Sequence, residues 1–423
     1  MQPDQTSLPG IRHRTLRSGP PSPILVLLAL VISVTPVVAV RAQDASDDAA
    51  RRARLHLGPL AVNPSIALTN VGVDTNVFNE LEDPKRDFTA TVSPQGQFWL
   101  RLGKGRVSGN TRLDYVYFGR YSGQRAVNTY NTLRADVRLN RIAPYASDTF
   151  LKARERPGYE IDARSRRTEN TLTLGADARV GAQTTLGLAA WQTIIKFDAD
   201  EVFAGSNLSD VLNRTADGVR ATLRHRLTPY TTIVLLAEAQ RDRFRLSDAR
   251  DSDSVRIMPG VELNPFALVS GAASVGFRKY DALGTGSRSF RGVVGSVDLG
   301  YTLLTSTRIS VRADRDLVYS FQIQEPYYVL TGVTGTFTRR VGTMWDVQAT
   351  AGRQRLRFQG IGSGLAIGND RTDTVNRFGG GGGYRFPSGL RLGLNIDHLR
   401  RRSDRNVRDY AGFRAGISVT YGS

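Results

Sequence analysis

The chain has 423 residues and no cysteine, and 57 Lys+Arg against 39 Asp+Glu give it a formal net charge of +18. A soluble protein this basic would suggest a nucleic-acid partner. Here the basic residues are scattered singly and form no stripe or tail, which argues against nucleic acid. The absence of cysteine suits a protein that crosses an oxidising compartment and needs no disulfide. No Pro-rich, Ser-rich or charged linker divides the chain, so we expect one large architecture.

The amino terminus predicts a targeting segment. Arginines precede an apolar run from Ile24 to Val40, and the run ends just before Ala42 and a polar stretch. A basic region, an apolar core and a small residue at the end are typical of a secretory signal peptide, which we assign to residues 1–42. A retained membrane anchor is the alternative, but Pro36 interrupts the run, whose roughly 17 residues are at the short limit for a spanning helix.

The rest of the chain alternates between apolar and polar residues. Alternate side chains of a strand point to opposite faces, so each such segment has one apolar and one polar face. Residues 88–102 and 107–121 show the pattern. The carboxyl end shows it best, with Phe413, Ala415, Ile417, Val419 and Tyr421 interleaved with Arg414, Gly416, Ser418 and Thr420.

Strand length separates a membrane barrel from a soluble β-sandwich or propeller. Globular strands usually run about 5–6 residues, whereas these alternations persist for about 12–16, as tilted membrane strands do. No apolar stretch after Ala42 is long enough to span as a helix, so a membrane protein with this sequence must be a barrel.

Short turns with Gly or Pro, such as 103–105 and 387–389, alternate with longer polar stretches, such as 156–167 and 359–372. Outer-membrane barrels have this asymmetry of periplasmic turns and external loops. We therefore predict an all-β fold: a closed transmembrane antiparallel β-barrel over residues 64–423. Counting the segments between turns gives eighteen strands, within a range of 16–18. Both termini are then periplasmic, and residues 43–63 form a short periplasmic segment before the barrel.

One amino-terminal stretch also resembles a known family. Pro64-Ser65 opens a strand, Asp74-Thr75-Asn76-Val77-Phe78 follows, and Phe88 leads into Val92-Ser93-Pro94. This stretch resembles the outer-membrane family known as β-barrel porin 2. The resemblance implies an outer-membrane barrel of a Gram-negative bacterium, an association with exopolysaccharide production and export, and no catalytic residues to carry over.

Patterns that could support chemistry are weak. His225 and His398 have no serine at a spacing that would make a nucleophile–base pair. The glycine run 379–383 is followed by a strand and not by the helix that a phosphate loop requires, so we assign it to a bend or to tight strand packing. The acidic loop 198–201 lacks the spacing of a calcium loop. We predict no enzyme activity, no catalytic residue, no cofactor and no metal site.

Aromatic side chains near strand ends predict interfacial girdles. A ladder that stacks sugars would need them on the other, lumen-facing parity. We place in the girdles Trp99, Tyr115, Tyr117, Tyr130, Trp191, Phe197, Tyr301, Tyr327, Phe337, Trp345, Tyr384, Phe413 and Tyr421.

The polar parity predicts the lumen. Arginines there could pair with acids on neighbouring strands and stiffen the wall, or a surplus could raise the anion concentration in a water-filled channel. The lumen-lining candidates are Arg101, Arg112, Arg134, Arg138, Arg220, Arg224, Arg256, Arg308, Arg312 and Arg414.

These features predict a porin-like outer-membrane channel that passes anionic solutes or acts in exopolysaccharide export. The alternative is a non-conducting scaffold barrel of an envelope polysaccharide machine. The expected partners are outer-membrane lipid, the barrel-assembly machinery, and small anions or anionic polysaccharide.

Overall fold

The computed structural model describes residues 49–264, 267–284, 288–361, 371–404 and 408–422. The predicted signal peptide, residues 1–42, lies outside the described residues. No helix in those described ranges is long and apolar enough to cross a bilayer.

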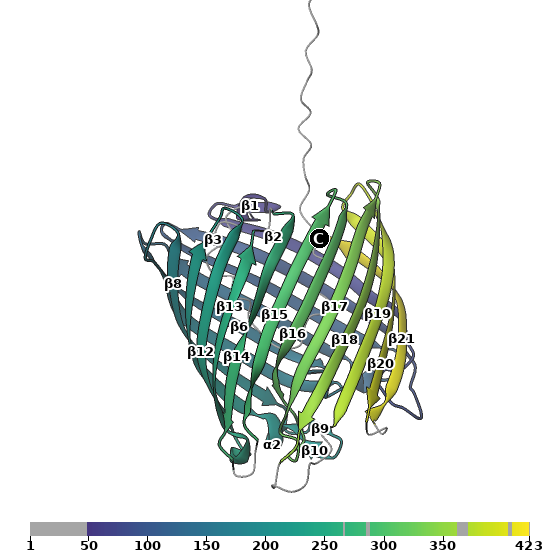
Figure 1. Ribbon diagram of the computed structural model, residues 1–423. Helices are drawn as coiled ribbons and strands as arrows, with labels where there is room; N and C mark the ends of the chain where they lie inside the picture. The colour runs from purple at the N-terminus through teal and green to yellow at the C-terminus, as the bar shows by residue number, and fades with distance from the viewer. Residues whose placement is uncertain (1–48, 265–266, 285–287, 362–370, 405–407, 423) are drawn as a thin grey trace, which may run out of the picture.

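Eighteen antiparallel strands form a single closed wall in the part of the chain that the structure describes (Figure 1), which confirms the predicted fold and strand count. Strand β21 pairs back onto β2 and closes the barrel. The wall strands are β2 (Leu60–Asp74), β3 (Asp87–Leu102), β4 (Gly105–Phe118), β5 (Ala126–Val137), β6 (Ile142–Glu155), β7 (Ser165–Arg179), β8 (Thr184–Phe197), β11 (Arg214–Arg226), β12 (Thr231–Phe244), β13 (Ser252–Leu263), β14 (Val269–Ala282), β15 (Phe290–Leu303), β16 (Thr307–Tyr319), β17 (Tyr327–Val341), β18 (Trp345–Gln359), β19 (Thr372–Arg385), β20 (Leu390–Ser403) and β21 (Tyr410–Tyr421).

Short turns and long loops lie at opposite ends of the barrel. The carboxyl terminus is at the end with the short turns, and the small elements of the longest loops are at the other end (Figure 1). By the usual asymmetry the short turns mark the periplasmic end and the long loops the extracellular end. The remaining elements are β1 (Leu55–Leu57), β9 (Val202–Phe203), β10 (Ser206–Asn207), α2 (Leu208–Leu212), and the 3-10 turns η2 (Ser122–Gln124) and η3 (Asp248–Arg250).

The two faces of the wall differ as the alternation predicts. On β21, Ile417 faces outward with 47% of its surface exposed, whereas Ser418 faces inward and is 5% exposed. Large apolar side chains stay exposed on the outer face of nearly every strand, where lipid covers them in a membrane. Buried charged residues such as Asp136 and Glu238 lie on the inner face.

An irregularity occurs where the barrel closes. The pairing of β2 with both neighbours shifts between Leu68 and Gly72, and Asn70 within the shift has a φ of 53°. A side chain at Gly72 would meet the Ala415 carbonyl oxygen at 2.0 Å. The bulge and the glycine together let the first and last strands approach each other closely.

Strands β15 and β16 separate at their extracellular ends. Their pairing ends at Gly295 and Arg315, although both strands continue, β15 against β14 and β16 against β17. Beyond that point Asp316 accepts hydrogen bonds from Arg256 and Arg278 on the inner face. The end of the β16–β17 hairpin has therefore left the wall and lies inside the barrel.

Several aromatic residues contradict the girdle prediction. Trp99, Tyr130, Trp191 and Phe197 face inward by register, and Tyr327 is buried in an inner cluster. Trp99 packs against alanines of the segment that precedes β1. The ring of Trp191 occupies the space beside Gly218, where a Cβ would lie 2.4 Å from it. These rings fill space inside the barrel.

Charge tolerance tests which face is which. Ile417→Arg puts a charge on the lipid-facing side near the middle of β21, which costs about 2–4 kcal/mol at the bilayer midplane. Thr132→Arg adds the same charge at an exposed position of the inner face of β5. We expect Ile417→Arg to lower the yield of heat-modifiable folded barrel and Thr132→Arg to leave it unchanged.

Ser418 also faces inward, but it is a poorer control because its hydroxyl accepts a hydrogen bond from Asn395 in a packed site. Equal assembly of the Ile417→Arg and Thr132→Arg variants would contradict the assignment of the two faces.

Candidate functional site

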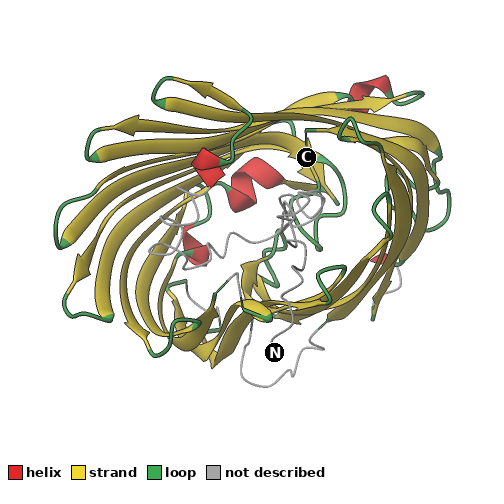
Figure 2. Ribbon diagram, turned by 90° about the horizontal axis from the view of Figure 1, so that it is seen from above, coloured by secondary structure: helices red, strands yellow, loops and turns green. Residues whose placement is uncertain are grey.

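Loops fill the extracellular half of the barrel interior. Seen along the barrel axis, helical turns lie inside the ring of strands (Figure 2). Helix α2 packs there against the β16–β17 hairpin tip and against the loop that joins β6 to β7. The apolar side chains of this cluster are Ile161, Phe197, Phe203, Leu208, Val211, Leu212 and Phe321.

A buried carboxylate links two of these loops. Glu160, in the β6–β7 loop, is 2% exposed. It accepts a hydrogen bond from the Ser320 hydroxyl at 2.6 Å and one from the Phe321 amide at 3.2 Å. Arg371 lies 3.8 Å from the same carboxylate. One side chain therefore holds the β6–β7 loop to the β16–β17 hairpin tip.

Two buried arginines extend this network to the wall. Arg401 on β20 pairs with Asp373 on β19 and, at 2.9 Å, with Asp162. Arg371 pairs with Glu325 at 3.0 Å and lies over the Phe358 ring, 3.6 Å from its centroid. Breaking a buried pair leaves an uncompensated charge, so the Arg401–Asp162 and Arg371–Glu325 pairs tie loops firmly to the inner wall.

A third arginine holds the hairpin tip through carbonyl oxygens. Arg250 of η3 donates to the Val211 carbonyl at 2.9 Å, to that of Pro326 at 3.0 Å and to that of Ser320. It therefore connects α2, η3 and the hairpin. Together these contacts, which we name the loop plug, narrow the extracellular half of the barrel.

The middle of the interior carries a chain of ion pairs. Glu238 lies between Arg220 and Arg256, and Arg256 and Arg278 both pair with Asp316. The pairs cross strands β11 to β16 and join the wall to the displaced hairpin. This region resembles a stiffening ladder more than a free charge surplus.

The ten lumen-lining candidates all lie on the inward parity, and most are in contact with acids or rings. Arg112 and Arg134 lie over Tyr130 and Tyr145, Arg224 pairs with Glu262 at 3.3 Å, and Arg414 pairs with Asp74 at 2.7 Å. Arg220 and Arg256 belong to the ladder, and Arg312 pairs with Asp298. Arg101, Arg138 and Arg308 lie at the periplasmic end of the wall.

Further arginines join those three at the periplasmic end. Each is on the inward parity within a residue or two of a periplasmic turn. We name this set the periplasmic arginine ring: Arg101, Arg138, Arg179, Arg226, Arg308, Arg340 and Arg385. All but Arg385 are exposed. Arg179, Arg226, Arg340 and Arg385 are not among the sequence-predicted candidates. The signal that could have found them is an arginine on the polar parity at or next to the last residue of a strand.

The described residues hold no group of three or more His, Asp or Glu that could bind a metal ion. His225 faces outward, with its Nδ1 2.9 Å from the Thr184 hydroxyl. His398 also faces outward, paired in register with Phe378 and Phe413.

A family model described as "Putative beta-barrel porin 2" matches residues 55–422. The chain belongs to this family. The predicted resemblance is thereby confirmed, and a porin family points to a channel and not to an enzyme. Family and barrel together place the protein in the outer membrane of a Gram-negative bacterium. No curated protein matches the chain.

Solved outer-membrane porins are similar in outline. OpdK of Pseudomonas aeruginosa, solved with vanillate, is 10% identical, with 85% of this chain and 98% of that chain covered and a TM-score of 0.45. A BenF-like porin from Pseudomonas fluorescens Pf-5 is 11% identical, with 86% and 98% covered and a TM-score of 0.48. OccAB3 of Acinetobacter baumannii is 11% identical, with 85% and 99% covered and a TM-score of 0.46.

Glu160 makes the loop plug sensitive to pH. Burial raises the pKa of its carboxyl from 4.5 to about 7, against the opposing effects of Ser320 and Arg371. If the loop left the plug, the pKa would return to its ordinary value. The packed loop therefore holds a proton that the released loop loses, and a rise in pH from about 4.5 to about 7 weakens the packing.

We expect protease cleavage within 156–164 to become faster as the pH of intact barrels rises through this window. Glu160→Gln, which keeps the shape and removes the titration, should flatten the dependence. Burial also raises the pKa of the neighbouring Asp162. An unchanged pH profile in Glu160→Gln would therefore show that Glu160 is not the titrating group and would point to Asp162.

Proposed function

We propose that this protein is an outer-membrane channel that favours small anionic solutes, with the periplasmic arginine ring as its selective mouth and the loop plug as its extracellular constriction. The observation that carries the proposal is the ring itself. Seven arginines from strands around the wall point into one opening. Clustered like charges in a narrow, low-dielectric opening raise the local concentration of counter-ions.

The residue type supports anions in particular. Arginine keeps its charge at any working pH, and its planar guanidinium matches carboxylate, sulfate and phosphate groups. The ladder farther inside is largely neutralised by its own acids, so it contributes rigidity more than selectivity. We therefore assign selectivity to the mouth.

Reversal of charge at the mouth tests this assignment. In planar bilayers with a salt gradient, the native protein should show a reversal potential of the sign that anion preference gives. Arg179→Glu, Arg226→Glu and Arg308→Glu combined should shift that potential toward cations. The shift should shrink as salt rises, because exposed charges are screened over about 10 Å at 0.1 M.

Arg339 offers a matched control. It lies at the same end of the wall, adjacent to Arg340, but on the outward parity. Arg339→Glu changes the net charge without placing it in the mouth, so selectivity should stay native. Native selectivity in the triple variant, or cation preference in the unaltered protein, would refute the proposal.

The loop plug favours a second candidate, the non-conducting scaffold barrel. If the plug stays closed, the protein forms no pores in the bilayer assay at any pH from about 4 to about 8. Export of an anionic polysaccharide would use the same basic mouth, but a chain-like solute would need the plug loops to move aside.

We also propose that residues 1–42 are a cleaved signal peptide and that the mature chain begins with a short periplasmic segment. Amino-terminal sequencing of protein purified from outer membranes tests this: the first residue should be Gln43, and retention of residue 1 would contradict it.

A further inference from the structure

We propose that the outer face of β18, β19 and β20 binds the phosphorylated glycolipid of the outer leaflet through a basic cluster that lies above an apolar groove. The proposal rests on the outer-membrane location and does not depend on whether the barrel conducts. It assigns a role to the glycine run 379–383, which the channel does not use.

The basic cluster lies on the lipid-facing parity. Arg353, Arg355 and Arg357 occupy successive outward positions in the extracellular half of β18, and Arg400 and Arg402 do so on β20. All five are exposed. Outward positions in a barrel wall are normally apolar, because charge there is costly within the hydrocarbon. Such a row suits a polyanionic neighbour at the headgroup level.

The register brings the two rows together around one strand. Asn376 of β19 pairs with Arg353 on one side and with Arg400 on the other. Thr374 is flanked in the same way by Arg355 and Arg402. Facing arginines are thus two strand spacings apart, about 10 Å. Guanidinium groups at that distance can approach a phosphate from both sides or hold two phosphates of one headgroup.

Several other outward basic residues in the extracellular half are already neutralised. Arg166 contacts three acids, Arg243 pairs with Asp253 at 2.8 Å, and Lys279 pairs with Asp281 at 2.6 Å. Among the described residues, no ion pair joins Arg353, Arg355, Arg400 or Arg402 to a carboxylate. The β18–β20 face therefore keeps its positive charge for an external partner.

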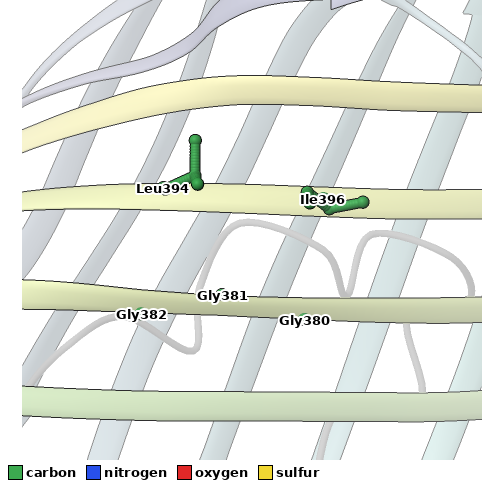
Figure 3. Close-up of a pocket in the computed structure, with 5 residues that line it drawn as sticks. All are labelled: Gly380, Gly381, Gly382, Leu394 and Ile396. Carbon is green, nitrogen blue, oxygen red and sulfur yellow. The ribbon is translucent and has the colours of Figure 1, made fainter.

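An apolar groove lies directly below the cluster, toward the membrane centre. Its volume is about 450 Å³, and it is lined by Gly380, Gly381, Gly382, Leu394 and Ile396. In the close-up, the side chains of Leu394 and Ile396 lie on β20 beside the bare glycine strand (Figure 3). Gly380 and Gly382 face outward, and Ala349 borders Gly380 on β18. Because β19 has no side chains here and both neighbouring strands do, the outer face has a groove that an acyl chain can fill.

Charge and groove together select the occupant. A glycerophospholipid with one phosphodiester would leave most of the arginines uncompensated, and free phosphate would not use the groove. A glycolipid with two phosphomonoesters and several acyl chains satisfies both, and its leaflet is the one that the long-loop end of the barrel enters.

The test uses full-length folded protein in phosphatidylcholine nanodiscs, with purified bis-phosphorylated lipid A as the probe and native mass spectrometry to count bound lipid. The combined variant Arg355→Gln/Arg402→Gln should bind lipid A about tenfold more weakly, because charge-assisted contacts to phosphate are lost. Gly380→Leu should also weaken binding, since a Cβ there meets only the Gln348 carbonyl at 3.7 Å and the added side chain fills the groove.

Arg339→Gln, which removes an outward arginine at the periplasmic end, should bind as the native protein does. Lipid A stripped of its phosphates should bind at least about tenfold more weakly to the native protein. Equal binding by the double variant and the Arg339 control would overturn the proposal. So would displacement of lipid A by an equal concentration of phosphatidylglycerol, which indicates a general anionic-lipid surface, or of inorganic phosphate, which indicates a simple anion site. Heat-modifiable migration checks that each variant is folded.

Discussion

The structure depends on one constraint: within hydrocarbon, a strand's backbone amides and carbonyls must bond to neighbouring strands, because no water can do so. A sheet meets that requirement only when its last strand pairs with its first. The bulge around Asn70 and the close approach at Gly72 are the local adjustments that allow β2 and β21 to pair. Closure then gives every strand an outward and an inward face. The side chains on each face determine what that face can bind or stabilise.

Inside the barrel, charge has three separate uses. At the extracellular end, buried arginines fasten loops to the wall through Asp162, Glu325 and backbone carbonyls. In the middle, the Arg220–Glu238–Arg256 contacts brace neighbouring strands. At the periplasmic end seven inward arginines lie around the opening, and all but Arg385 are exposed. The proposed anion selectivity rests on this last group.

The strand pattern was predictable because a period of two is written directly in the sequence wherever one face is apolar. Ile417 and Ser418 could be assigned to opposite faces without coordinates for that reason. The eighteen strands followed from counting turns, whose Gly and Pro residues are local signals. The inward parity of the ten arginines followed from the same alternation.

What the sequence could not reveal depends on contacts between distant segments. The rings of Trp191 and Tyr130 look like girdle residues until register places them opposite Gly218 and Arg112. Loops have no periodicity, so nothing near Glu160 indicates that it meets Ser320. The outward arginines of β18 and β20 appear in the sequence as unremarkable basic residues. Only the pairing with β19 shows that they converge.

The separation of β15 from β16 changes what it takes to move the hairpin tip. A strand end in a continuous wall cannot leave its place without breaking several main-chain hydrogen bonds at once. Between β15 and β16 those bonds are already absent above Gly295 and Arg315, so on this side the tip is held by side chains, while β17 remains paired with β18. A swing of the tip back into the wall would therefore form new backbone pairs as the inner contacts dissolve. The inward position of the tip and its position in the wall would therefore each be stabilised by a different set of interactions.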